Sequence, residues 1–345
     1  MTIEDVKQPE CIFKAITEAE SIPQKPVVAI RCYTYKQGPY IKRALEGFVK
    51  QKTDFPFVAI IHDDASPDNT AEVLREYEQK YPDIIKPIYD PVNRYTEGSL
   101  EVVVDSIIDA YSPKYEAICE GDDYWTDPLK LQKEVDFLDT HSDYALVYTD
   151  RNIDCNGLIT HSKAGKIKRP SNDDYREFLL DTPNSPILTL TVMFRESAYK
   201  RIKKIWRNER FLLTDLCMWI ELSHEGKFYY LDEVTACYGV LPKSATHSSD
   251  VADRVKFDES ARSIFRLYRN HYNYKTNSTD LDRKYIIRFI KLAYLNNRKD
   301  IAEKYYQEAK DKNIATFKIR LLYFMAVYGD RFFLKELLNL KRKLF

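Results

Sequence analysis

The stretch AICEGDDYWTD, residues 117–127, decides the fold because it joins an apolar strand to a cluster of acids. The apolar run at 115–119 predicts a buried strand. Three carboxylates follow it, on Glu120, Asp122 and Asp123. Carboxylates gathered at one strand end repel each other and lose solvation, and a hard divalent cation with oxygen ligands relieves both effects. The stretch therefore predicts a cation site that also holds nucleotide phosphates.

A second interpretation of this stretch needs no ligand. Asp122 and Asp123 then form a turn, Asp127 caps the following helix, and Pro128 takes its first position. For Asp127 and Pro128 this interpretation suffices. It leaves Glu120 unexplained, and matching carboxylates elsewhere in the chain would favour the cation.

Outward from this stretch, apolar strands alternate with amphipathic helices at a spacing of about 30 residues, which is typical of stacked βαβ units. Strands are predicted at 27–30, 57–61, 84–89, 115–119, 144–149 and 187–194. Ser66 as N-cap and Pro67 predict the start of one helix, and Asp127-Pro128 that of another. We therefore expect an α/β fold with a Rossmann-like, mostly parallel sheet flanked by helices.

Composition limits the classes of function. Lysine plus arginine and aspartate plus glutamate each total 53, so no net charge attracts nucleic acid. The six cysteines lack paired spacing, which predicts reduced thiols in a cytosolic protein. Residues 1–8 lack the apolar core of a signal peptide, and no apolar run approaches the roughly 20 residues that span a bilayer. We expect a cytoplasmic protein that binds no nucleic acid.

Further candidate ligand residues follow other strands. Ligands of parallel α/β sheets bind beyond the carboxyl ends of the strands, where this chain has Tyr33, Tyr35, Asp64 and Arg94 besides the acidic cluster. Singly, these residues suit packing, turns or solvated charge. Together they suit a nucleoside diphosphate, because a carboxylate accepts the N3 hydrogen of uracil, an aromatic ring stacks on a base, and a metal neutralises phosphates. The first strand lacks a glycine-rich phosphate loop, which argues against a dehydrogenase or NTPase.

Three segments in order carry a family resemblance: residues 33–35 (YTY), 62–70 (HDDASPDNT) and 120–125 (EGDDYW). They resemble the motifs of glycosyltransferase family 2, the inverting nucleotide-sugar transferases with the GT-A fold, over residues 26–240. The resemblance implies a bacterial polysaccharide-type enzyme of the EC 2.4 type. Such an enzyme moves a sugar from a nucleotide-diphosphate donor to a hydroxyl of a glycan or lipid-linked acceptor.

The resemblance also implies roles for the residues at the strand ends. Tyr35 stacks on or borders the base, and Asp64 hydrogen-bonds it, so a UDP-sugar is the favoured donor. Asp122, the second acid of the Asp-x-Asp motif, is the main ligand of Mn²⁺ or Mg²⁺. Asp123 lies near the ribose or the donor sugar, and Glu120 stands where the family more often has Asp. Tyr33, Arg94 and Glu120 complete the expected donor site.

Asp215 is the candidate general base. It stands at the start of a predicted helix, where an acid commonly caps the helix. In the family the corresponding acid deprotonates the acceptor hydroxyl, and one carboxylate can do both. Two other functions stay open: a non-catalytic nucleotide-sugar-binding protein and, less favoured, a sugar-phosphate nucleotidyltransferase.

The expected domain organisation has three parts. Residues 1–25 form an N-terminal helix and linker, 26–245 a GT-A catalytic domain, and 246–345 a helical region that resembles helix-hairpin repeats of the tetratricopeptide kind. Residues 312–345 hold eight basic and two acidic side chains, a difference of +6. This basic end suits peripheral contact with an anionic membrane at the inner face of the cell membrane, or ordinary packing.

Overall fold

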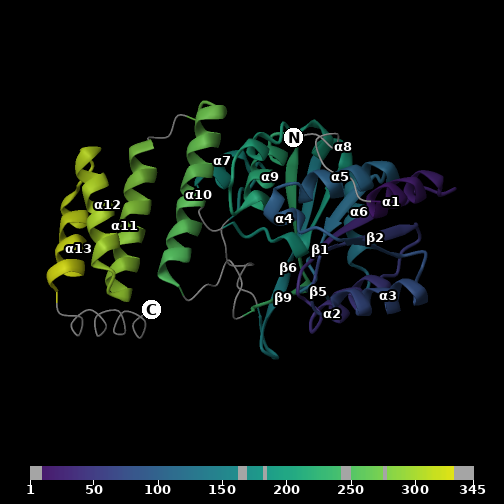
Figure 1. Cartoon of the computed structure of the whole chain (residues 1–345). Coiled ribbons are helices and arrows are strands. Elements are labelled where there is room, and N and C mark those ends of the chain that lie inside the picture. The colour runs from purple at the N-terminus through teal and green to yellow at the C-terminus, as the bar shows by residue number, and fades with distance from the viewer. Residues whose placement is uncertain (1–9, 162–168, 182–184, 242–249, 275–277, 330–345) are drawn as a thin grey trace. The chain divides into compact units, whose positions relative to one another are not determined.

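The computed structural model describes residues 10–161, 169–181, 185–241, 250–274 and 278–329 (Figure 1). The chain divides into two compact units. The first holds residues up to Arg210 together with Thr214–Leu241, and the second holds Phe211–Leu213 together with the chain from Pro242 onward.

The first unit is built on one mixed sheet. Among the described residues its strands lie in the order β3-β2-β1-β4-β8-β6-β9-β5, and β7 pairs with β6. Their bounds are β1 Val28–Thr34, β2 Phe57–Asp64, β3 Ile85–Asp90, β4 Tyr115–Ile118, β5 Tyr124–Trp125, β6 Tyr144–Cys155, β7 Leu158–His161, β8 Val192–Arg195 and β9 Lys227–Gly239. β3, β2, β1 and β4 run parallel, and β8 is antiparallel to β4. The predicted α/β fold with a mostly parallel sheet is confirmed.

Helices cover both faces of this sheet (Figure 1). Apolar side chains of α2 (Ile41–Val49), α3 (Thr70–Lys80) and α6 (Lys130–Thr140) pack in one core with alternate residues of β1, such as Val28 and Ile30. On the other face, α1 (Glu10–Ser21) and α5 (Leu100–Tyr111) pack around Ala29, Val58 and Ile60. The remaining helices of this unit are α4 (Arg94–Glu97), α7 (Arg176–Asp181), α8 (Glu196–Arg201) and α9 (Thr214–Leu222).

Several predicted element ends are wrong. α3 begins at Thr70 rather than Pro67, because the Asp68 carboxylate accepts the Thr70 N–H and holds a turn before the helix. α6 begins at Lys130 rather than Pro128, since Asp127 accepts the Leu129 N–H in the same way. The strand predicted over 187–194 is a 3-10 helix at Thr189–Thr191 followed by β8.

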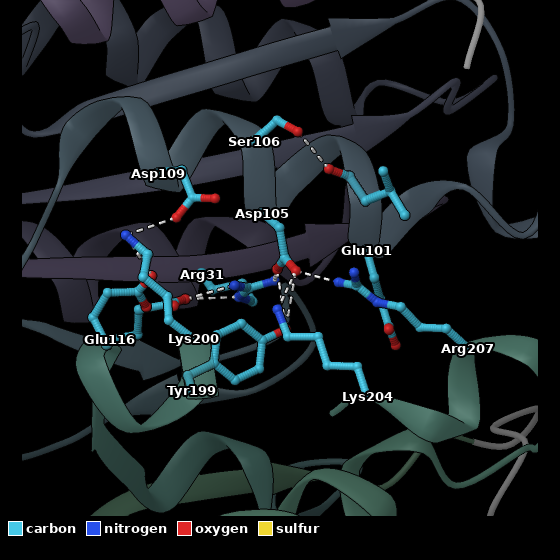
Figure 2. Close-up of polar contacts among 12 residues, drawn as sticks. Arg31, Glu101, Asp105, Ser106, Asp109, Glu116, Tyr199, Lys200, Lys204 and Arg207 are labelled. Atoms are coloured by element: carbon cyan, nitrogen blue, oxygen red, sulfur yellow. Dashed lines mark hydrogen bonds and ion pairs between the residues drawn. The ribbon is translucent and has the colours of Figure 1, made fainter. Parts of the chain in front are cut away.

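A buried ionic network joins α5 to the sheet and to the chain that follows β8 (Figure 2). The Asp105 carboxylate lies 2.7 Å from Arg31 and 2.8 Å from Lys204, and it also pairs with Arg207. Arg31 in turn lies 2.7 Å from Glu116 on β4. Burial raises the pKa of Asp105, but the three cations outweigh burial and hold that pKa well below its ordinary value.

Removing the charge of Asp105 is expected to destabilise the fold severely. Asp105→Asn leaves three largely buried cations without their shared anion, and such a loss costs about 3–5 kcal/mol of unfolding free energy. Because the pKa of Asp105 is lowered in the folded state, its contribution is present above the unfolded value of about 3.9 and disappears as the pH falls below it. Urea unfolding at neutral and acidic pH measures both effects.

Asp109 offers a matched control on the same helix. Its side chain is 54% exposed and pairs with Lys200 at 2.9 Å, at the rim of the same network (Figure 2). Asp109→Asn is expected to cost less than about 1 kcal/mol, as exposed ion pairs do. Equal losses for the two variants would contradict the central role of Asp105.

The second unit is helical, as predicted for the C-terminal region. Its described helices are α10 Val251–His271, α11 Ser278–Asn296, α12 Lys299–Asp311 and α13 Phe317–Tyr328. Arg262 of α10 is buried, and its Nη2 lies 2.8 Å from the Asp282 carboxylate of α11 and 2.5 Å from the Glu308 carboxylate of α12. Among the described residues, none of the helices has the length and apolarity needed to cross a membrane.

Candidate functional site

The acidic motif lies at the carboxyl end of β4, against the end of β1. The backbone N–H of Gly121 donates to the carbonyl of Tyr33 at 3.0 Å, which continues the β1–β4 pairing beyond β4. A turn follows, in which the Asp123 N–H donates to the carbonyl of Glu120 at 3.1 Å. These bonds fix the backbone that carries the three carboxylates.

Glu120 lies among acids from distant parts of the chain. Its carboxylate accepts a hydrogen bond from the Thr189 hydroxyl at 2.7 Å. Burial and the charges of Asp122 and Asp215 raise the pKa of Glu120 to about 7. Asp215 is in the first turn of α9, and burial followed by the charge of Glu101 raises its pKa too. Carboxylates from β4, α9 and α5 therefore act on one another electrostatically.

Asp122 is supported by residues that follow β1. The side-chain amide of Gln37 hydrogen-bonds the Asp122 carboxylate. The hydroxyl of Thr34 and the Oε1 of Gln37 are buried and have no hydrogen-bond partner among the described residues. A Cβ at Gly121 would come within 2.4 Å of Gln37 Oε1 and 2.6 Å of Ile41 Cδ1, so any larger residue there would displace the ends of these two side chains.

The donor set suits a divalent cation that also binds substrate phosphates. The described residues contain no group of three or more His, Cys, Asp or Glu side chains arranged to hold a metal alone. Mg²⁺ commonly binds through one or two carboxylates together with phosphates and water. Asp122 and the neighbouring Glu120 supply such a pair, and a cation would offset the repulsion that raises the pKa of Glu120.

Asp123 joins the motif to β9. Its Oδ1 accepts the N–H of Gly239 at 2.7 Å, and its side chain is buried. A Cβ at Gly239 would lie 2.4 Å from the carbonyl oxygen of Asp122, so glycine is required for this close approach. Asp123 thereby fixes the end of β9 beside the acidic motif.

The two tyrosines predicted at the donor site differ in their surroundings. The Tyr33 hydroxyl accepts a hydrogen bond from Arg31 at 3.1 Å, and its ring packs with the core beneath α5. Tyr35 is 43% exposed, and the Lys36 ammonium lies 4.9 Å from the centre of its ring. Tyr35 therefore has a ring face at the surface, whereas Tyr33 belongs largely to the interior.

Asp64 and Arg94 lie together at the ends of β2 and α4, and both are buried. The Asp64 carboxylate accepts the N–H groups of Arg94 at 2.5 Å and Tyr95 at 3.2 Å, so it caps α4. The Arg94 Nε lies 2.8 Å from the Asp90 carboxylate. Its Nη2 is buried and has no hydrogen-bond partner among the described residues.

Three residues at this site were not predicted from the sequence: Thr189, Gln37 and Glu101. Thr189 is 69 residues from Glu120, and its neighbours Leu188 and Leu190 give only an apolar pattern. Gln37 is two residues after the segment 33–35, and this position next to the motif is the one feature of the sequence that indicates a role for Gln37. Glu101 resembles an ordinary acid in the first turn of a helix.

The mixed α/β sheet carries the acidic motif at the end of β4, and its fold is of the GT-A type found in a solved glycosyltransferase structure. Residues 28–203 match the family described as glycosyl transferase family 2. The chain belongs to this family, and the resemblance drawn from its motifs is confirmed.

The chain is similar to parts of several curated proteins. Rv1520 of Mycobacterium tuberculosis is 41% identical over 121 residues, which cover 35% of this chain and 34% of that protein. The chain thus spans about a third of the length of the first curated relatives it matches. The putative glycosyltransferase EpsE of Bacillus subtilis is 28% identical over 61% of this chain and 69% of its own length.

A solved structure shares the fold. Residues 1–349 of TarS from S. aureus, crystallised with UDP, align over 88% of this chain and 92% of that chain. The TM-score is 0.51 and the sequence identity is 17%.

Proposed function

We propose that this protein is a metal-dependent, inverting glycosyltransferase. It transfers a sugar from a nucleotide-diphosphate donor, with UDP-sugars favoured, to a hydroxyl of a glycan or lipid-linked acceptor. The observation that carries this proposal is the acidic motif that follows β4. There, the charges of Asp122 and of Asp215, from α9, both raise the pKa of Glu120. EpsE and the dTDP-rhamnosyl transferase RfbG of Shigella flexneri, 23% identical over 54% of this chain and 61% of its own length, carry transferase names that agree with it.

The exposed ring of Tyr35 and the acidic motif support the proposed donor contacts, whereas both oxygens of the Asp64 carboxylate accept backbone N–H groups of α4. Tyr35 offers an exposed ring for stacking on a base, and Asp64 and Arg94 lie at the adjacent strand end. The Tyr33 hydroxyl bonds Arg31 on the same strand, and Asp123 and Glu120 belong to the acidic motif. TarS binds UDP and UDP-GlcNAc in its solved structures, which supports a UDP-sugar for this chain.

The reaction is a single displacement. The Asp215 carboxylate takes the proton of the acceptor hydroxyl. The acceptor oxygen forms a bond to the anomeric carbon of the sugar, while the bond from that carbon to the diphosphate oxygen breaks. The nucleoside diphosphate leaves with the electron pair, and the sugar inverts. Asp122, with Glu120 beside it, would hold Mn²⁺ or Mg²⁺, and such a cation would neutralise negative charge on the leaving diphosphate.

Two predictions concern where the protein lies in the cell. The cytoplasmic setting and the peripheral contact with the inner face of the membrane both stay predictions. Much of the basic charge assigned to that contact belongs to residues 330–345, which lie outside the described residues.

A thermal-shift screen of nucleotide sugars with Mn²⁺ tests the proposal. A ligand at 100 times its dissociation constant is expected to stabilise the fold by about 2.7 kcal/mol. UDP-sugars should give the largest shift, and omission of Mn²⁺ should reduce it. If no nucleotide sugar stabilises the protein with Mn²⁺ or Mg²⁺, the proposed function is wrong.

A further inference from the structure

Arg151 on β6 is a largely buried arginine whose charge is poorly paired. Its side chain is 14% exposed and reaches the Asp150 carboxylate at 3.6 Å and the Pro186 carbonyl at 3.5 Å, both at the long end of polar contacts. Its Nε is buried and has no hydrogen-bond partner among the described residues. Burial lowers the pKa of Arg151, the Asp150 carboxylate only partly opposes this, and the charge of Arg169 adds to the lowering.

Other buried arginines of the same unit are closely paired. Arg31 lies 2.7 Å from Glu116, and Arg94 lies 2.8 Å from Asp90. Burial lowers the pKa of both, but the neighbouring carboxylates more than reverse this and raise it. A buried guanidinium without such a partner is unfavourable, which distinguishes Arg151 from arginines that serve the fold.

Arg169 supplies a second cation, whose charge acts on Arg151. Its guanidinium carbon lies 3.4 Å from the centre of the Tyr230 ring, and its Nε donates to the Tyr148 hydroxyl at 2.9 Å. Tyr148 and Tyr230 are neighbours in the register of β6 and β9. Stacking and this hydrogen bond fix the plane of the guanidinium, and planar forks of N–H donors suit carboxylate and phosphate oxygens.

The arginine pair lies near the acidic motif. Pro186, whose carbonyl contacts Arg151, is three residues before Thr189, whose hydroxyl donates to Glu120. Three residues of chain span at most about 11 Å between Cα atoms. The hydroxyl of Thr149, two residues before Arg151, also contacts the carbonyl of Thr191 at 3.4 Å. The loop that carries Thr189 therefore borders both groups of residues.

We infer that Arg151 and Arg169 form a subsite for an anionic group, a phosphate ester or a carboxylate, carried by the acceptor. This inference rests on the proposed function, because it names the class of acceptor for the same reaction. The Asp150 carboxylate, which also lies beside the Tyr230 hydroxyl at 3.4 Å, limits the subsite to one anion held by the two guanidinium groups. Tyr230 provides the ring against which one of them is stacked.

Thermal-shift titrations on the full chain, with UDP and Mn²⁺ at saturation to fill the donor site, test the subsite. Glycerol 1-phosphate and glucuronate are the anionic probes, and glycerol is the uncharged control. Glycerol is expected to give no shift. A shift with glycerol 1-phosphate alone identifies a phosphate-bearing acceptor, and a shift with glucuronate alone identifies a carboxylate.

Two variants and a matched control locate the binding. Arg151→Gln and Arg169→Gln are each expected to weaken anion binding at least about tenfold, with the UDP shift unchanged. Arg75 provides the control. Its guanidinium lies 4.9 Å from the centre of the Tyr89 ring on β3, the edge strand at the opposite end of the sheet from β6 and β9. Arg75→Gln should bind the anion like the wild type. Without an anion, Arg151→Gln should keep or raise the melting temperature, whereas a structural ion pair would lower it.

The outcomes separate this inference from the proposed function. If UDP stabilises the protein but neither anion does, the subsite is wrong and the transferase proposal stands. If the arginine variants lose the UDP shift instead, the two residues belong to the donor site and the inference is overturned. If an anion binds but no nucleotide sugar does, the acceptor assignment fails together with the proposed function.

Discussion

Asp122→Asn is expected to abolish metal-dependent sugar transfer without unfolding the protein. Metal stabilisation of a leaving diphosphate is worth several kcal/mol, so the loss in kcat should be about 10³-fold or more. The substitution keeps the shape of the side chain and an oxygen for the Gln37 amide, so the fold should remain. Transfer measured over a range of Mn²⁺ concentrations, with a thermal melt of each variant, checks both parts.

Asp136 provides the control for this prediction. It is an exposed acid on α6, 13 residues after Asp123, and it accepts a hydrogen bond from Gln132 at 2.9 Å. Asp136→Asn should leave both transfer and its Mn²⁺ dependence unchanged. Wild-type turnover in Asp122→Asn would remove Asp122 from the metal site.

Asp215→Asn is expected to lower kcat by about 10²- to 10⁴-fold, because an amide cannot take the proton of the acceptor hydroxyl. Binding of UDP with Mn²⁺, measured by thermal shift, should be preserved. A lower kcat with unchanged UDP binding distinguishes a transferase from a non-catalytic nucleotide-sugar-binding protein. In the latter, Asp215 would have no effect on slow hydrolysis of the donor. Glu209→Gln, at an exposed acid before α9, is the matched control.

The pH dependence gives a second readout for Asp215. A general base must be deprotonated, so activity should fall as the pH drops through its pKa. Burial raises that pKa, and the charge of Glu101 adds to the effect, so the acid limb should lie above the ordinary aspartate value of about 3.9. Glu101→Gln should move this limb to lower pH. If the acid limb stays at the same pH in both Asp215→Asn and Glu101→Gln, the group that titrates is not Asp215.

The sequence was sufficient for the fold class because local patterns record it. The order of buried strands and amphipathic helices follows from apolar runs and helical spacing, which predicted the α/β class and the edge of the sheet where the acids gather. The position of Asp215 in the first turn of a helix was equally readable. The exact starts of α3 and α6 were not, since single aspartate side chains hold turns ahead of them.

The surroundings of individual site residues could not be predicted. Whether Tyr33 turns its hydroxyl toward a nucleotide or toward Arg31 depends on α5, which lies far along the chain. The Asp64 carboxylate serves α4, 30 residues onward. The contact of Thr189 with Glu120 likewise exists only after the sheet has formed. The packing of Tyr33 against α5 and the contacts of Asp64 and Thr189 are all long-range, and no local pattern of residue types records their partners.

The Asp105 network limits how this protein can be recombined with its relatives. One carboxylate on α5 pairs with cations from β1 and from the chain after α8, so the earlier and the later parts of the first unit share this counterion. A chimera joined anywhere between residues 105 and 204 would combine an anion from one parent with cations chosen for another. Hybrid enzymes built to exchange donor specificity should therefore carry Arg31, Asp105, Lys204 and Arg207 from the same parent.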